Sequence, residues 1–282
     1  MRPLVLVTRG SPLARRQADL TAAHLTAALG RAIEIRIIVT TGDQQAHWSL
    51  EKQGGKGLFT AELEEALRRG EGDIAIHSAK DLPTAMPSGL TLAGFLPRED
   101  ARDTLVRRTE ISIPRKIATG SPRRRAQGAK LFKNVEWSEL RGNVDTRLRK
   151  VAEGQADATY LAQAGLNRLG IREWPGLVFE PVSLSQMVPA AGQGAIALQT
   201  RTEDAAHYTP VLDAATARAV GIERLFLARL GEGCHTAFAC HVSGDRVSIF
   251  RDDFGRQDFP MPAKDVNEAE AVVTHILSTI KS

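Results

Sequence analysis

Cysteine, aromatic residues and long apolar runs are all scarce in this chain of 282 residues. Two cysteines, Cys234 and Cys240, are too few for a disulfide scaffold and leave room for one functional thiol. No apolar run approaches the ~18 residues that cross a bilayer, and the first residues lack the apolar core and cleavage site of a signal peptide. We therefore expect a cytoplasmic protein with no membrane partner.

The charge balance and the low aromatic content bear on nucleic-acid binding. Lys and Arg number 37 against 33 Asp and Glu, for a net charge of +4, and only 5% of the residues are aromatic. The basic residues are not interleaved with aromatic ones, and no helix-turn-helix or RNP-like string occurs. We therefore expect no nucleic-acid partner. A hydrophobic share of 43% is typical of a soluble globular protein.

One short phrase occurs twice. The two copies share Gly-Ser-Pro, an arginine and a glutamine: Gly10, Ser11, Pro12, Arg15 and Gln17, then Gly120, Ser121, Pro122, Arg125 and Gln127. Each follows a strand-like apolar run, which predicts a strand that leads into a helix capped by serine, with proline at its first position. Such a helix start, with arginines beside it, favours anion binding. The alternative is two ordinary capped helices with solvated arginines.

The order of strand and helix signals predicts the domain organisation. Strands and helices alternate over residues 1–96, and residues 97–188 repeat the plan, which indicates two mostly parallel sheets with helices on their faces. Residues 189–210 are expected to return to the first domain. Residues 211–282 predict a small α+β carboxyl-terminal domain. The α/β pair resembles two periplasmic-binding-protein-like (type II) domains with a central cleft.

Arginine is concentrated in the second predicted domain, where strands end and helices begin. These ends share one edge of a parallel sheet, where such folds bind ligands, so we expect four side chains to converge there: Arg123, Arg124, Arg141 and Arg147. Guanidinium groups pair with carboxylates in a bidentate manner, which points to a substrate with several carboxylates. We interpret Arg125, Arg149 and Lys150 as solvent-facing helix charges.

Two segments of the first predicted domain are candidates for chemistry. Lys80 and Asp81 follow a predicted strand, and the adjacent carboxylate and cation serve either as an ion pair or as a general acid/base. Residues 53–59 are rich in glycine but do not match the Walker pattern. With the polar residues from 41 onward they are more typical of a mobile lid.

Cys234 lies in a glycine-rich loop, where a thiol remains reachable. It is a candidate nucleophile or covalent attachment point. A buried structural cysteine is one alternative. A metal site with His235, Cys240 and His241 is another, although their spacing is not that of a usual zinc knuckle, and we expect no metal.

Taken in order, several strings resemble the porphobilinogen deaminase family, also called hydroxymethylbilane synthases. They span most of the chain: Thr8-Arg9-Gly10-Ser11-Pro12-Leu13-Ala14, Gly54-Gly55-Lys56-Gly57-Leu58-Phe59, His77-Ser78-Ala79-Lys80-Asp81-Leu82-Pro83, Arg98-Glu99-Asp100, Ser121 with Arg123 and Arg124, Leu140-Arg141-Gly142-Asn143-Val144, Ala164-Gly165-Leu166 and Gly192-Gln193-Gly194. The sequence departs from the family pattern at Pro122, and from His235 to Phe238.

This resemblance implies a transferase of tetrapyrrole (haem) biosynthesis. It would condense four porphobilinogen molecules head to tail, with loss of ammonia, on a dipyrromethane cofactor bound by a thioether to Cys234, and release hydroxymethylbilane by hydrolysis. By resemblance Asp81 is the catalytic acid/base, and the lid contains Lys52, Lys56 and Phe59. The family is usually monomeric. The residues implied to bind substrate and cofactor are Arg9, Ser11, Gln17, Lys80, Thr119, Ser121, Arg123, Arg124, Arg141, Gly142, Arg147 and Gln193.

A protein of another class remains open on the sequence. Two anion-binding α/β domains also suit a non-catalytic binding protein for a small polycarboxylate. The mass of the intact protein separates the two hypotheses, since only the enzyme carries a dipyrromethane on Cys234.

Overall fold

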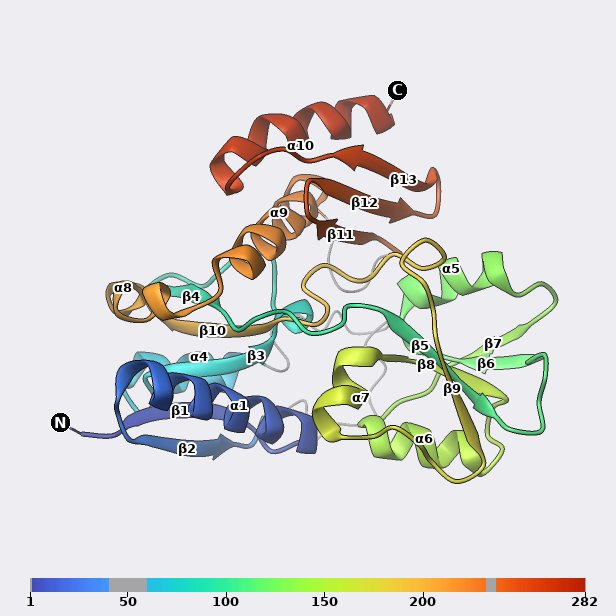
Figure 1. The fold of residues 1–282 in the computed structure, drawn as a ribbon, viewed down its shortest axis with the longest axis horizontal. Coiled ribbons are helices and arrows are strands. Elements are labelled where there is room, and N and C mark those ends of the chain that lie inside the picture. Colours follow the sequence, from blue (N-terminus) through green and yellow to red (C-terminus); the bar gives the residue numbers. More distant parts are fainter. Residues whose placement is uncertain (1, 41–59, 232–236, 282) are drawn as a thin grey trace. The chain divides into compact units, whose positions relative to one another are not determined.

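The computed structural model describes residues 2–40, 60–231 and 237–281. The chain divides into two compact units (Figure 1). Unit 1 comprises Met1–Glu99 and Ala195–Ala217, and unit 2 comprises Asp100–Gly194 and Arg218–Ser282. Each unit has hydrophobic clusters of its own.

Unit 1 contains a five-stranded sheet in the order β2-β1-β3-β10-β4. Its strands are β1 (Leu4–Arg9), β2 (Ile33–Ile38), β3 (Ile74–Ser78), β4 (Leu90–Phe95) and β10 (Ile196–Arg201). β1, β2 and β3 are parallel, whereas β10 runs antiparallel to β3 and β4. Strand β10 comes from a distant part of the sequence, so residues before and after the segment Asp100–Gly194 build one sheet.

Both faces of this sheet are covered by helices, α1 (Pro12–Leu29) and α4 (Ala61–Arg68). The shorter elements of unit 1 are η1 (Ala79–Asp81), η2 (Thr202–Asp204), α8 (Ala205–Tyr208) and η3 (Thr209–Val211). Side chains of β1 alternate between the faces: Leu6 packs with Leu25 of α1, and Val7 packs with Leu63 of α4. A strand buried on both sides is typical of the centre of a parallel sheet.

Unit 2 contains a second five-stranded sheet with an equivalent order, β7-β6-β8-β5-β9. Its strands are β5 (Asp103–Arg108), β6 (Lys116–Ala118), β7 (Glu136–Ser138), β8 (Ala158–Ala162) and β9 (Leu177–Pro181), and its helices are α5 (Pro122–Leu131), α6 (Val144–Ala152) and α7 (Gln163–Leu169). β5 is the antiparallel strand, as β10 is in unit 1. The predicted pair of type II α/β domains is therefore confirmed at the level of the sheets.

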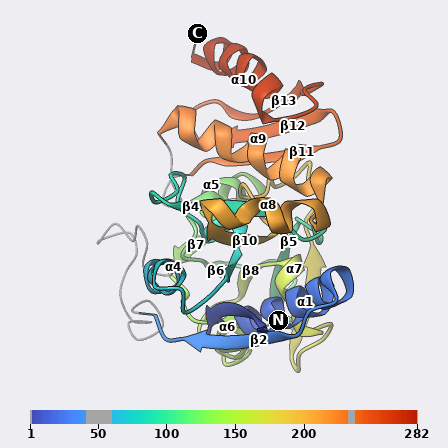
Figure 2. The ribbon, with the colours of Figure 1, turned by 90° about the vertical axis from the view of Figure 1, so that its left-hand side faces the viewer.

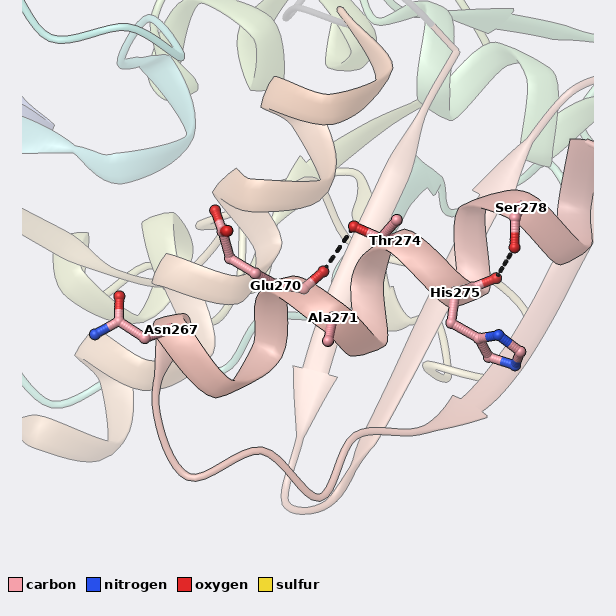
Figure 3. Close-up of a pocket in the computed structure, with 6 residues that line it drawn as sticks. All are labelled: Asn267, Glu270, Ala271, Thr274, His275 and Ser278. Atoms are coloured by element: carbon pink, nitrogen blue, oxygen red, sulfur yellow. Dashed lines mark hydrogen bonds between the residues drawn. The ribbon is translucent and has the colours of Figure 1, made fainter.

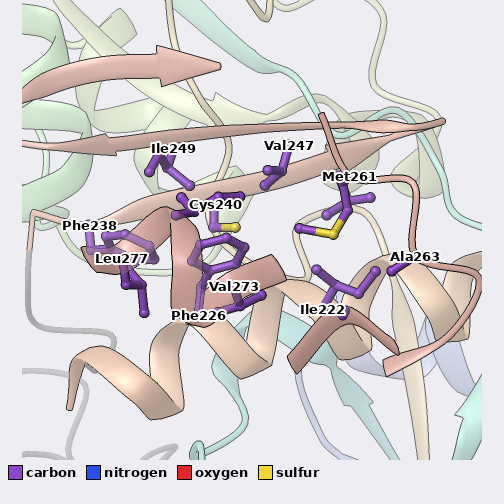
Figure 4. Packing of buried hydrophobic residues seen from close by; sticks show 13 residues of the cluster. Ile222, Phe226, Phe238, Cys240, Val247, Ile249, Met261, Ala263, Val273 and Leu277 are labelled. Atoms are coloured by element: carbon purple, nitrogen blue, oxygen red, sulfur yellow. The ribbon is translucent and has the colours of Figure 1, made fainter. Parts of the chain in front are cut away.

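The carboxyl-terminal part of unit 2 is a three-stranded antiparallel sheet covered by two helices, as predicted. It consists of α9 (Ala214–Leu230), β11 (Ala239–Ser243), β12 (Arg246–Arg251), β13 (Gly255–Pro260) and α10 (Val266–Lys281). Figure 2 shows α9 alongside the sheet, and Figure 4 shows Phe226, Val273, Cys240 and Ile249 packed between helices and strands. The helices cover one face of the sheet because both contribute apolar side chains to this core.

Candidate active site

The two serine-proline phrases form the helix starts that the sequence predicts. In unit 1, Ser11 caps α1, and its hydroxyl oxygen accepts a hydrogen bond from the amide of Ala14 at 3.3 Å. In unit 2, Ser121 caps α5 and accepts from the amide of Arg124 at 3.4 Å. Proline is the first helical residue in both cases. Each unit therefore presents the positive end of a helix at the carboxyl end of a central strand.

Asp81 lies at this edge of unit 1. β3 ends at Ser78, and η1 (Ala79–Asp81) follows, held by a 3.0 Å hydrogen bond from the amide of Ala79 to the carbonyl oxygen of Ala195. Asp81 is exposed and Lys80 is half-buried. Arg9 ends β1, the parallel neighbour of β3, so it lies at the same edge. The structure thus places Arg9, Ser11, Lys80 and Asp81 around one sheet edge.

Gln17 is buried behind this edge, where its amide bonds to the strand end. Its Nε2 donates to the Ser78 hydroxyl at 2.9 Å, and that hydroxyl lies 3.3 Å from Gln17 Oε1. The side chain is only 2% exposed. In this structure Gln17 therefore joins α1 to the last residue of β3, directly before the turn that contains Lys80 and Asp81.

In unit 2 the edge contains Thr119, Ser121 and the arginine-rich start of α5. The Thr119 hydroxyl accepts from the amide of Ser121 at 3.2 Å. Arg123 and Arg124 are the next residues along α5, yet their side chains are only 5% and 7% exposed. Both guanidinium groups bind the carboxylate of Asp103, which is fully buried. Burial lowers the pKa of Arg124, although the charge of Asp103 opposes this shift.

Gln193 joins the same carboxylate. Its Nε2 donates to Asp103 Oδ1 at 3.1 Å and to the carbonyl oxygen of Ala101 at 2.8 Å. Three residues that the resemblance assigns to ligand binding thus meet at one aspartate, which the sequence analysis did not identify. The only signal for Asp103 in the sequence is an acidic residue at the start of an apolar strand.

Arg141, Gly142 and Arg147 form a second basic group in unit 2. Arg141 donates from Nε and Nη2 to Glu139 Oε1, at 2.8 and 2.5 Å. Arg147 Nε donates to the carbonyl oxygen of Gly142 at 2.6 Å. Gly142 has a φ of 119°, and a Cβ there would lie 2.6 Å from Cγ2 of Thr146. Only glycine allows this tight turn at the start of α6.

Glu223 is a second buried acid that the sequence analysis missed. Its carboxylate accepts from the amides of Gly192 at 2.7 Å and Val242 at 2.8 Å, and lies 3.4 Å from His241 Nδ1. Glu223 therefore joins α9 to β11 and to the loop that contains Gln193. Arg168 of α7 donates to the carbonyl oxygen of Gly194 at 2.6 Å, so the end of this loop is held as well.

Some predicted residues lie outside the described residues: Cys234, Lys52, Lys56 and Phe59. Cys240 is fully buried in the apolar core of the carboxyl-terminal part. Within the described ranges, no group of three His, Cys, Asp or Glu residues is arranged to hold a metal ion. In the same part of the chain, no helix combines the length and apolar character needed to span a bilayer.

A surface hollow lies on α10. It is lined by Asn267, Glu270, Ala271, Thr274, His275 and Ser278, all from that one helix (Figure 3). None of the predicted site residues lines it. Its hydroxyl groups bond to the helix itself, from Thr274 to the carbonyl oxygen of Glu270 and from Ser278 to that of His275. The hollow is therefore part of the ordinary helix surface.

Each unit is an α/β sheet with a serine-capped helix that starts at the carboxyl end of a central strand, which is the place where α/β folds of this class bind ligands. The family model described as "Porphobilinogen deaminase, dipyromethane cofactor binding domain" matches residues 4–209. The chain belongs to the porphobilinogen deaminase family.

Curated relatives with this name cover most of the chain. The porphobilinogen deaminase of Nitrobacter winogradskyi is 43% identical over 257 residues, which are 86% of this chain and 80% of that protein. The enzyme of Paracoccus denitrificans is 42% identical over 260 residues, 88% of this chain and 82% of the relative. Among solved structures, the periplasmic VFT2 domain of Bordetella pertussis BvgS matches with a TM-score of 0.44 and 18% identity, covering 74% of this chain and 85% of that one.

Proposed function

We propose that this chain condenses four porphobilinogen molecules head to tail, with loss of ammonia, and releases hydroxymethylbilane by hydrolysis. The observation that carries the proposal is the exposed carboxylate of Asp81 beside Lys80, at a strand end flanked by Arg9 and the start of α1. Family membership supports this function, because relatives over most of the chain are porphobilinogen deaminases. We further expect a cytoplasmic monomer.

The donors at the two edges suit a dipyrromethane cofactor, whose acetate and propionate groups are carboxylates. Lys80 and Arg9 in unit 1, and Arg141, Arg147 and the start of α5 in unit 2, supply the cationic and N–H donors that such groups need. When bound, the cofactor supplies the free pyrrole α-carbon on which the product grows. We assign its thioether to Cys234.

Asp81 is the proposed acid/base in each condensation. As a carboxylic acid it donates a proton to the amine of porphobilinogen, the carbon–nitrogen bond breaks, and ammonia leaves a cationic azafulvene. The resulting carboxylate stabilises that cation by its charge. After the new carbon–carbon bond forms, the same carboxylate accepts the proton lost from the pyrrole α-carbon, and Asp81 is ready for the next substrate.

The basic residues are proposed to hold carboxylates and so to align the two pyrroles. Alignment of this kind contributes up to about 7 to 11 kcal/mol of barrier lowering in favourable cases. Bidentate guanidinium pairs fix direction as well as distance, which suits substrates that carry two carboxylates each. A tight α6 start, fixed by Gly142, gives Arg141 a defined position.

The mass of the intact protein tests the covalent assignment. We expect the purified wild-type chain to exceed its sequence mass by one dipyrromethane, and Cys234→Ala to lose that increment. Cys240→Ala is the matched control, because its thiol is buried in an apolar core, and it should keep the increment. A bare mass for wild type, together with no consumption of porphobilinogen, would contradict the proposed function and favour the polycarboxylate carrier.

A further inference from the structure

Asp103 occupies a particular place in the sheet of unit 2. It is the first residue of β5, and it pairs with Ala162, the last residue of β8. Because β5 runs antiparallel to β8, its beginning lies at the edge where the parallel strands β6 and β8 end. This is the edge at which α5 starts and at which α/β folds bind ligands. A fully buried carboxylate therefore lies directly behind a ligand-binding edge.

Five donor contacts converge on this carboxylate. Arg123 donates from Nη1 to Oδ2 at 2.7 Å and from Nη2 to Oδ1 at 3.1 Å. Arg124 approaches Oδ1 with Nε at 2.9 Å and Nη2 at 2.8 Å, and Gln193 Nε2 lies 3.1 Å from the same oxygen. Asp103 thus sets the plane and direction of both guanidinium groups.

The same cluster fixes the backbone around the start of α5. Arg123 Nη1 also donates to the carbonyl oxygen of Val188 at 2.8 Å, and Arg124 Nη1 donates to that of Tyr160 at 2.8 Å. Gln127 bonds to both backbone groups of Val188, at 2.9 and 2.7 Å. The first turn of α5, the end of β8 and the loop that follows Val188 are therefore held in one arrangement.

The charges of this cluster do not cancel. Two guanidinium groups face one carboxylate, so the described cluster contains a net positive charge beneath the helix start. In a buried environment this charge attracts an anion more strongly than a solvated one would. Loss of the carboxylate would increase the positive charge but remove the contact that orients both arginines. Charge and geometry therefore make opposite predictions for ligand binding.

We propose that Asp103 is a positioning residue for the anion site of unit 2: it orients Arg123 and Arg124 and holds the first turn of α5 in the geometry that binds a substrate carboxylate. This inference rests on the proposed function, which supplies porphobilinogen as the ligand. It differs from a purely structural role because it predicts a loss of binding that replacement of a structural aspartate at the opposite end of the same sheet does not produce.

Asp157 provides that comparison. It precedes β8 at the opposite edge of the same sheet, and its Oδ2 accepts from the amides of Arg115 at 2.8 Å and Lys116 at 2.9 Å. Replacement of either aspartate by asparagine removes one charge with little change in shape. Both variants should lose stability, whereas only Asp103→Asn should change the binding of porphobilinogen.

The experiment uses protein that carries its cofactor, with kcat and KM measured for porphobilinogen and cofactor content read from the intact mass. For Asp103→Asn we expect KM to rise at least about tenfold, with a smaller change in kcat, whereas Asp157→Asn should keep KM within about twofold of wild type. Asp103→Glu covers the case in which the asparagine variant does not fold. It retains the charge but displaces it by one methylene, so it should fold with a raised KM.

A wild-type KM in Asp103→Glu, or a lowered KM in Asp103→Asn, would overturn the proposal in favour of charge alone. Equal KM values for Asp103→Asn and Asp157→Asn would reduce Asp103 to a structural role. These outcomes differ from failure of the proposed function, in which the wild-type protein itself neither consumes porphobilinogen nor is stabilised by it against thermal unfolding.

Discussion

His77 gives unit 1 a pH-dependent stability that can be calculated from its surroundings. It lies on β3, is 6% exposed, and its Nε2 is 3.0 Å from Oε1 of Gln199. Gln199 Nε2 donates in turn to Glu64 Oε1 at 3.3 Å, so its oxygen faces the histidine and His77 must donate from Nε2. Burial lowers the pKa of His77 to about 4, and the charge of Arg9 adds to this shift, against the hydrogen bond to Gln199.

The direction of the effect follows from proton uptake. The ordinary pKa of histidine is 6.5, so between pH 6.5 and about 4 the unfolded chain binds the proton and the folded protein does not. Folding stability therefore falls as the pH falls through this range, and it is insensitive to His77 above it. A pKa difference of this size corresponds to about 3 kcal/mol when the titration is complete, and to about 2 to 3 kcal/mol at pH 4.5.

His77→Gln isolates this contribution, since the amide retains a donor for Gln199 and does not titrate. As the pH falls from 8 to 4.5, the free energy of unfolding in urea should decrease by about 2 to 3 kcal/mol more for wild type than for the variant. The exposed His275 provides the control, and His275→Gln should follow the wild-type curve. Parallel curves for wild type and His77→Gln would refute the reasoning, because they would mean that His77 titrates normally in the folded protein.

Two further substitutions address the proposed chemistry. Asp81→Asn should lower kcat by about 10² to 10⁴-fold, the usual contribution of a general acid/base. Asp19 is exposed on α1, and Asp19→Asn should leave kcat unchanged. Near-normal turnover of Asp81→Asn would remove Asp81 from the mechanism. Arg141→Leu removes the guanidinium group that pairs with Glu139, shortly before α6. The variant should accumulate partly extended enzyme intermediates, visible in the intact mass. Normal product formation would contradict the proposal that Arg141 binds substrate carboxylates.

Local sequence signals predicted the helix starts of the candidate site. A serine cap and a proline at the first helical position act within a few residues, so Ser11-Pro12 and Ser121-Pro122 predicted α1 and α5 without knowledge of the rest of the fold. For the same reason the preceding apolar strand predicted that Lys80 and Asp81 follow a strand end. These features depend on neighbours along the chain.

The partners of the arginines depend on contacts far apart in the sequence. Asp103 lies 20 residues before Arg123 and 90 before Gln193, and they meet only because β5 enters its sheet antiparallel beside β8. The predicted boundary between the first two domains falls at residue 97, a few residues before β5 begins. Charged residues at both ends of that strand obscure its short apolar centre.

The duplicated phrase also proved to have unequal roles in its two copies. Gln17 bonds to the side chain of Ser78, at the strand end that leads to Asp81. Gln127, its counterpart, bonds to the backbone of Val188. Where β3 is followed by Lys80 and Asp81, β8 is followed by Ala164 and Gly165. The repeated framework is thus shared, whereas the candidate acid/base occurs in one copy.

The similarity of the two sheets extends to the edges where the parallel strands begin, opposite the edges that contain the candidate site residues. Asp73 precedes β3, its Oδ2 accepts from the amide of Val5 at 2.9 Å, and its own amide donates to the carbonyl oxygen of Val5 at 2.8 Å. Asp157 makes the same pair of bonds with Lys116, both at 2.9 Å. In each unit an aspartate therefore joins the start of one central strand to the backbone of its neighbour, and this correspondence supports a common plan for the two sheets.

Asp73 is more strongly held than its counterpart, because Arg2 and Arg201 also bind its carboxylate, at 2.5 and 3.3 Å. Burial alone would raise the pKa of Asp73, but the hydrogen bonds from Arg2 and the amide of Val5 outweigh it and lower the pKa below 3.8. Its contribution to stability is therefore present above pH 3.8 and lost as the pH falls through the lowered value. Asp73→Asn should lower the free energy of unfolding by about 2 kcal/mol at pH 7, measured by urea unfolding, because hydrogen bonds to a charged group are lost, and this loss should shrink below pH 3.8. Asp19→Asn should show neither effect. Equal stability of Asp73→Asn and wild type at pH 7 would contradict a stabilising role for the bonds to the Asp73 carboxylate.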